Sequence, residues 1–148
     1  MFKRILVTTD GSALSDQAVA KAIDLSLLTG AQLFVVTVAH LEPHSYFEGS
    51  SVLTQREVEE SHHRAIAAGQ ALVDAVKATA LAKGVASAEA VLMKSNQVAE
   101  SIIEAARSHD CDLIVMASHG RRGLTRMLMG SETQHVLTHS HTPVLVLR

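Results

Sequence analysis

Hydrophobic and polar positions follow two patterns along the chain: short apolar runs, and longer segments whose apolar residues recur with a helical period. A short continuous run rich in Val, Ile and Leu is typical of a strand buried on both faces. On this pattern we predict strands at residues 4–9, 31–40, 87–93, 112–118 and 143–148.

The segments with a helical period predict four helices, at residues 15–29, 57–83, about 96–108, and from Ser131 onward. Gly30 and Gly84 stand where the first two helices should end. Ser95 or Asn96 can cap the third helix. Gly69 lies on the apolar face of the long second helix, which predicts close packing against the sheet. Residues 41–56 have Pro, Gly and Ser without a period and are predicted to form a loop.

Alternation of strands and helices predicts an α/β fold, because strands that are apolar on both sides need helices to cover both faces. Right-handed crossovers then produce an open, doubly wound, Rossmann-like sheet of five parallel strands, for which we predict the order 3-2-1-4-5. A chain of 148 residues is long enough to bury a core, and we expect a single domain over residues 1–148.

Composition changes this picture little. The chain is 47% hydrophobic and 19% charged with a formal net charge of −2, so no global field attracts nucleic acid or an acidic membrane. The one cysteine, Cys111, excludes an intrachain disulfide and fits a reducing compartment. The N-terminal apolar run stops at Val7, too early for a secretory signal, and we expect no apolar segment of membrane-spanning length. We expect a cytoplasmic protein that inserts in no membrane and binds no nucleic acid.

The predicted topology indicates where a ligand would bind. In open α/β sheets, ligands bind at the carboxyl ends of the strands, where the strand order reverses. The candidate residues are those that end or follow the first, second and fourth strands: Thr8, Thr9, Asp10, Val38, Ala39, Met116, Ala117, Ser118, His119 and Gly120.

The stretch after the fourth strand, "SHGRRGLTRMLMGSET", is typical of an anion-binding loop. Ser131 and Gln134 have the spacing of a capping box, and the free N–H groups at that helix start would attract an anion. Gly120 and Gly123 permit positive φ angles, which turn successive N–H groups inward. Arginine guanidinium groups would add charge for phosphate oxygens. The arginines of this stretch are Arg121, Arg122 and Arg126.

Several common motifs are absent from the sequence. No lysine follows the glycines as a P-loop requires, no G-x-G-x-x-G follows the first strand, and no G-x-S-x-G elbow of a hydrolase occurs. The acidic pair of a receiver domain is also missing, since Asp10 stands alone.

The segment "DLIVMASHGRRGLTRMLMGSETQHVLTHSHTPVLVLR", together with "KRILVTTDGS" at the start, resembles the universal stress proteins over essentially the whole chain. The family's nucleotide-binding signature is G-x2-G-x9-G-[ST], and Gly120, Gly130 and Ser131 match it in spacing. Ala117 replaces the first glycine and adds a methyl group. Asn96 stands where related sequences often have glycine, and asparagine also tolerates left-handed geometry.

This resemblance implies an adenine-nucleotide (ATP or AMP) binding regulatory protein of the stress response, acting as a ligand-dependent switch. Asp10 would lie beside the ribose or a Mg2+ ion carried by the nucleotide, with Thr8 and Thr9 beside it. Val38 would reach the adenine edge, and Met116 and Ala117 would line the adenosine pocket. The phosphates would be surrounded by His119, Gly120, Gly130, Ser131, Glu132 and Thr133, and we expect the Glu132 carboxylate to point to solvent.

Two alternatives stay open beside the switch. One is a slow Mg2+-dependent ATP hydrolase, for which Asp10 and His119 are the candidate acid–base groups. The other is a nucleotide-free module that binds an unidentified protein partner. In the resembled family the last strand, here Val144–Arg148, pairs with its two-fold mate to form a homodimer, and a short apolar edge strand invites such pairing.

The remaining candidates favour structural roles. His135 and His139 are four residues apart with His141 nearby, a spacing that can bind metal, but no carboxylate or cysteine in the sequence evidently completes a site. Cys111 is expected to be a small buried hydrophobic residue.

Overall fold

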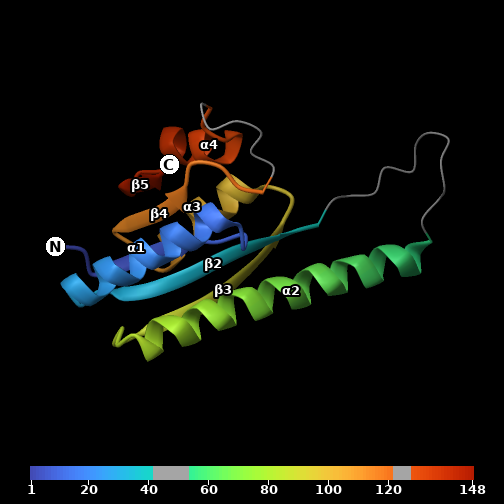
Figure 1. Cartoon of the computed structure of the whole chain (residues 1–148). Coiled ribbons are helices and arrows are strands. Elements are labelled where there is room, and N and C mark those ends of the chain that lie inside the picture. Colours follow the sequence, from blue (N-terminus) through green and yellow to red (C-terminus); the bar gives the residue numbers. More distant parts are fainter. Residues whose placement is uncertain (42–53, 122–127) are drawn as a thin grey trace.

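The structure, a computed structural model, describes residues 1–41, 54–121 and 128–148. These residues form a parallel five-stranded sheet with helices on both faces, in the order β3-β2-β1-β4-β5 (Figure 1). Both the α/β class and the predicted strand order are confirmed. The elements are β1 (Arg4–Thr8), α1 (Ala13–Thr29), β2 (Gln32–His40), α2 (Gln55–Ala82), β3 (Ala88–Ser95), α3 (Val98–Ser108), β4 (Leu113–Ala117), α4 (Ser131–His139) and β5 (Val144–Leu147).

Each face of the sheet carries its own hydrophobic core. Because successive side chains of a strand point to opposite faces, Ile5 and Val7 of β1 pack with α1 and α2, while Leu6 packs with α3 and α4. β2 divides in the same way, and Phe34 belongs to the second core. The central strands are therefore apolar throughout, which explains why the sequence shows continuous runs rather than alternation.

The strand order reverses at β1, and this reversal positions the site. β1 pairs with β2 on one side, with Val7 opposite Val35, and with β4 on the other, with Val7 opposite Val115. The chain first extends the sheet from β1 through β2 to β3, and only then crosses back to build β4 and β5. The loops that follow β1 and β4 thus leave the same edge of the sheet in different directions, which opens a crevice between them.

The first two helices begin earlier than predicted because their caps lie outside the apolar pattern. Ser12 caps α1 by accepting a hydrogen bond from the Ser15 N–H at 3.3 Å. Thr54 and Glu57 form a capping box at the start of α2, so residues 55 and 56, which we predicted as loop, are helical. Residues 42–53 of that predicted loop lie outside the described residues.

The predicted cap of α3 is wrong. Its N-cap is Gln97, whose side chain makes no capping bond. The Ser95 hydroxyl instead accepts a hydrogen bond from the Gln97 N–H at 2.9 Å, which closes a turn before the helix. The first N–H groups of α3 therefore depend on an acceptor from elsewhere in the fold.

Helix α2 corrects one expectation about membranes. By length and composition alone, it is long and apolar enough to cross a membrane, and it is the single such helix among the described residues. In the fold it lies along β2 and β3 (Figure 1), and its side chains Val73 and Ala80 are fully buried in the core on that face.

Gly69 lets α2 approach the sheet, as its place on the apolar face predicted. A Cβ at Gly69 would lie 2.8 Å from Leu92 Cδ1 of β3 and 3.3 Å from Thr37 Cγ2 of β2. Both contacts are closer than side chains normally tolerate, so the helix and the strands fit only because the methyl group is missing.

We predict that Gly69→Val lowers the free energy of unfolding by about 1–3 kcal/mol more than Ala68→Val does, because the added methyl groups overpack against Leu92 and Thr37. Ala68 is the exposed neighbour in the same helix. Valine is a poorer helix former than alanine but a better one than glycine, so helix propensity alone would make Ala68→Val the more destabilising change. Urea denaturation of the two variants measures the difference. Equal unfolding free energies would mean that α2 does not pack at Gly69 as described.

Candidate functional site

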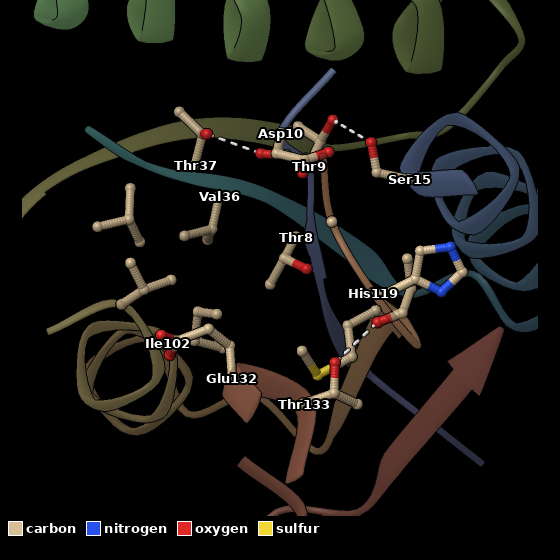
Figure 2. Close-up of a pocket in the computed structure, with 15 residues that line it drawn as sticks. Thr8, Thr9, Asp10, Ser15, Val36, Thr37, Ile102, His119, Glu132 and Thr133 are labelled. Atoms are coloured by element: carbon tan, nitrogen blue, oxygen red, sulfur yellow. Dashed lines mark hydrogen bonds between the residues drawn. The ribbon is translucent and has the colours of Figure 1, made fainter. Parts of the chain in front are cut away.

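A cavity of about 160 Å3 opens at the carboxyl ends of β1, β2 and β4. Figure 2 shows side chains from these strands, from α3 and from the start of α4 around the same space. Most of the predicted site residues line this cavity. They are Thr8, Thr9, Asp10, Val38, Met116, Ala117, His119, Gly120, Glu132 and Thr133.

The other predicted site residues do not line the cavity. They are Ala39, Ser118, Arg121, Gly130 and Ser131. Part of the cavity wall was not predicted from the sequence, namely Ser15, Val36, Thr37, Val98 and Ile102. Val98 and Ile102 stand four residues apart, so they share one face of α3, and that spacing is the signal that could have found them.

Asp10 joins the two loops at the crevice. Its Oδ1 accepts a hydrogen bond from the Ser12 N–H and its Oδ2 one from the Arg121 N–H, each at 2.9 Å. Burial raises the pKa of this carboxyl, but hydrogen bonds from Ser12, Arg121 and Ser15 outweigh it and hold the pKa below its ordinary value. Asp10 is therefore a carboxylate at neutral pH, held between the loops that follow β1 and β4.

Gly120 is required for a reason other than the predicted one. Its φ angle is not positive; instead, a Cβ at this residue would lie 2.5 Å from the Asp10 carboxylate. The absence of a side chain thus lets the chain after β4 reach Asp10. Arg121 extends its guanidinium group over Gly11, where a Cβ would lie 2.8 Å from it. Arg122, Gly123 and Arg126 lie outside the described residues.

The start of α4 differs in detail from the predicted capping box, which is wrong. Gly130 is the N-cap residue and Ser131 is already the first residue of the helix, so its hydroxyl is one position too late to cap. The Gln134 side chain donates instead to the Met129 carbonyl at 3.3 Å. The N–H groups of Ser131, Glu132 and Thr133 have no acceptor among the described residues, which leaves the anion site of a helix N-terminus open.

Gly130 brings this helix start against the end of β4. Its N–H donates to the Ser118 carbonyl at 2.7 Å, and a Cβ would lie 3.3 Å from that oxygen. Its φ of −61° is open to any residue, so close approach is again what favours glycine. The two glycines of the signature thus hold the open N–H groups of α4 beside the cavity.

Glu132 is an exposed residue, but its carboxylate is held by the protein instead of pointing freely into solvent as expected. Its Oε2 accepts a hydrogen bond at 2.9 Å from the N–H of Ala99, the second residue of α3. The physical reason is the missing cap of α3, since Gln97 supplies no side-chain acceptor for its first turn. Glu132 lines the cavity, and its negative charge offsets the positive end of the α3 helix dipole.

Hydroxyl groups form the buried rim of the cavity (Figure 2). Thr37 Oγ1 donates to the Thr9 carbonyl at 2.6 Å, and Thr9 Oγ1 lies 3.2 Å from Ser15 Oγ. Thr133 Oγ1 donates to the Ala117 carbonyl at 3.0 Å. His119 Nδ1 lies 3.1 Å from Ser118 Oγ, a partner that the sequence did not indicate. These bonds connect β1, β2, β4, α1 and α4 and fix the shape of the cavity.

The histidines of α4 lie away from this cavity. His135 Nε2 is 2.9 Å from Glu100 Oε1 of α3, and the His135 and His139 rings stack with centroids 4.2 Å apart. A carboxylate therefore does accompany His135, which the sequence did not indicate. Within residues 1–41, 54–121 and 128–148, no group of three or more His, Cys, Asp or Glu residues is arranged to hold a metal. Cys111 is buried as expected, and burial raises the pKa of its thiol to about 11.

The fold and the crevice define an α/β protein with an uncapped helix N-terminus at the switch point of its sheet. The sequence profile of the universal stress protein family matches residues 1–148, and the chain belongs to this family. A universal stress protein of Methanocaldococcus jannaschii is 32% identical over 150 residues, covering 100% of this chain and 83% of that protein. One from Thermus aquaticus is 32% identical over 148 residues, covering 100% of both chains.

Solved structures share the fold. A universal stress protein from Lactobacillus plantarum superposes with a TM-score of 0.84 at 20% identity, over 99% of this chain and 97% of that one. A universal stress protein in complex with cAMP has a TM-score of 0.70 at 23% identity, over 99% and 97% of the two chains. One from Archaeoglobus fulgidus in complex with dAMP has a TM-score of 0.63 at 18% identity, over 99% and 98%.

We predict that Asp10→Asn reduces the loss of unfolding free energy that the native protein shows on acidification. A carboxyl whose pKa is lower in the folded than in the unfolded state stabilises the fold above the unfolded pKa. That stability is lost as the pH falls through the folded value, here below about pH 4. Chemical denaturation between pH 7 and pH 3 should show a smaller loss on acidification for Asp10→Asn than for the native protein. Asp16→Asn, at an exposed position in the first turn of α1, is the control and should retain the native acid limb.

Proposed function

We propose that this protein is an adenine-nucleotide-binding regulator of the stress response, with ATP or AMP as its ligand. The observation that carries the proposal is the start of α4, where three adjacent N–H groups without an acceptor among the described residues stand beside the cavity. An unsatisfied helix N-terminus favours a phosphate through both its N–H groups and its dipole. Gly120 and Gly130 keep side chains out of the approach to it.

The remaining wall suits a nucleoside. Val36, Val38, Met116 and Ile102 offer an apolar slot of the kind that accommodates a flat base. Asp10 offers carboxylate oxygens for ribose hydroxyls next to it. Each of these oxygens accepts one backbone N–H and keeps a further lone pair for such a hydroxyl.

Two structural neighbours support the choice of adenine nucleotides, since one was solved with cAMP and another with dAMP. The site of this chain keeps the second and third glycines and the hydroxyl residue of the family signature, at Gly120, Gly130 and Ser131. Ala117, in place of the first glycine, directs its carbonyl to Thr133 and lines the cavity with its methyl group.

The regulatory part of the proposal is a ligand-dependent switch. A ligand at this cavity would contact both Gly120 and the start of α4, the two ends of the connection between β4 and α4. Its binding energy would favour the arrangement in which both ends approach the cavity. A partner protein in the cytoplasm would bind to that arrangement.

Ser131→Pro tests the phosphate site without breaking the helix. Proline is well tolerated at the first position of a helix, and Gly130, with φ −61° and ψ 150°, already has the extended backbone that a residue before proline prefers. The variant removes one N–H donor. At 100 times its dissociation constant, ATP or AMP should stabilise the native protein by about 2.7 kcal/mol in thermal unfolding. We expect a clearly smaller shift for Ser131→Pro.

Ser131→Ala is the matched control, because it removes the hydroxyl but keeps the N–H. It should retain most of the shift if the backbone holds the phosphate. Protein freed of carried-over nucleotide that shows no shift with ATP, ADP or AMP would contradict nucleotide binding. Trypsin digestion of the same samples tests the switch, and identical cleavage between β4 and α4 with and without ligand would contradict it.

We propose further that β5 pairs with its mate in a second copy to form a homodimer. β5 lies at one edge of the described sheet, and its Leu145 side chain is 39% exposed. Leu145→Arg should convert a dimer to a monomer in light scattering at micromolar concentration, because like charges would face each other across the two-fold axis. Leu28→Arg, at an exposed leucine of α1, is the control and should leave the mass unchanged. A monomeric native protein would refute this dimer.

A further inference from the structure

Glu132 places a negative charge on the wall of the cavity that the proposed function assigns to a nucleotide. It is the second residue of α4, and its backbone N–H belongs to the group that would hold phosphate. Its carboxylate turns to the N-terminus of α3 and accepts the Ala99 N–H at 2.9 Å. Backbone and side chain of one residue thus act in opposite directions on an anion, the N–H attracting it and the carboxylate repelling it.

The hydrogen bond to Ala99 fixes the position of this charge. A free glutamate at a helix start can swing into solvent when an anion arrives, whereas Glu132 would leave the first turn of α3 without its acceptor if it moved. Because the residue is exposed, water and salt weaken its repulsion but do not remove it.

The N-termini of α3 and α4 both lie at the cavity, and the Glu132 side chain accepts a hydrogen bond only from that of α3. Val98 and Ile102 bring α3 to the wall, and Thr133 brings α4. The carboxylate occupies the anion position of α3 and leaves that of α4 open. Among the described residues, the N-terminus of α4 is thus open to a phosphate group, whereas a further phosphate group near the N-terminus of α3 meets the carboxylate.

We propose that Glu132 is a specificity-determining residue that makes this site select nucleotides with a single phosphate group over those with a polyphosphate chain. The inference rests on the proposed function, since it concerns the ligand of the same cavity. The charge of the Glu132 side chain produces the selection, and the hydrogen bond from Ala99 only positions that charge.

Glu132→Gln separates charge from structure, because the glutamine side-chain oxygen can still accept the Ala99 N–H. We would titrate the native protein and the variant by calorimetry with adenosine, cAMP, AMP, ADP and ATP, without Mg2+ and at low salt. We expect unchanged adenosine affinity, a modest gain for AMP, and roughly five-fold or more tighter binding of ATP. The gain should shrink as sodium chloride is raised.

The matched control is Glu100→Gln. It removes the same charge from the first turn of α3, at a side chain that pairs with His135 and does not line the cavity. It should leave the ratio of AMP to ATP affinity close to the native value. The unfolding temperatures of both variants without ligand confirm that the fold is retained.

The outcomes distinguish the inference from the proposed function. A uniform change for all ligands, adenosine included, or an unchanged ratio of AMP to ATP affinity, would overturn the role of Glu132 and leave nucleotide binding intact. Weaker ATP binding by Glu132→Gln in the presence of Mg2+ would also overturn it, since the carboxylate would then serve a cation. Failure of every ligand to bind either protein would overturn both.

Discussion

Parallel pairing of β1 with both β2 and β4 is the constraint on which the rest of the structure depends. Parallel neighbours require crossover helices, so each face of the sheet must be covered, and the strands become apolar on both sides. Because the chain builds β2 and β3 before it returns to β4, the loops after β1 and β4 diverge at their carboxyl ends. The crevice is thus a consequence of topology, and Asp10 bridges it by accepting N–H groups from both loops.

The sequence was sufficient for the fold and for most of the residues that line the cavity. Continuous apolar runs can form only buried strands here, and the switch-point rule then selects residues such as Thr9, Asp10 and Met116 without any knowledge of side-chain contacts. The caps were less predictable. Thr54 and Glu57 lie outside the periodic segment that they begin, and Ser131 fits the spacing of a capping box but stands one residue inside the helix.

What the sequence could not supply were contacts between segments far apart in the chain. Glu132 and Ala99 are 33 residues apart, and Asp10 and Arg121 are 111 apart. No local pattern encodes either bond. The reason for Gly120 was hidden in the same way, because the sequence indicated a site of positive φ. In the structure Gly120 and Gly130 are sites of close approach, to the Asp10 carboxylate and to the backbone of residues 118 and 119.

Three helices, α1, α3 and α4, begin at this crevice, and they differ in what accepts their first N–H groups. Ser12 caps α1, and the Glu132 carboxylate of α4 accepts an N–H group from the first turn of α3. At α4 the N-cap is a glycine without a side chain, and no described residue accepts its next three N–H groups. Ser131 and Glu132 are exposed, so water reaches these N–H groups when no ligand is bound. Selective omission of a cap at one of three neighbouring helices, beside glycines that keep the approach clear, is the arrangement expected where an outside anion completes the structure.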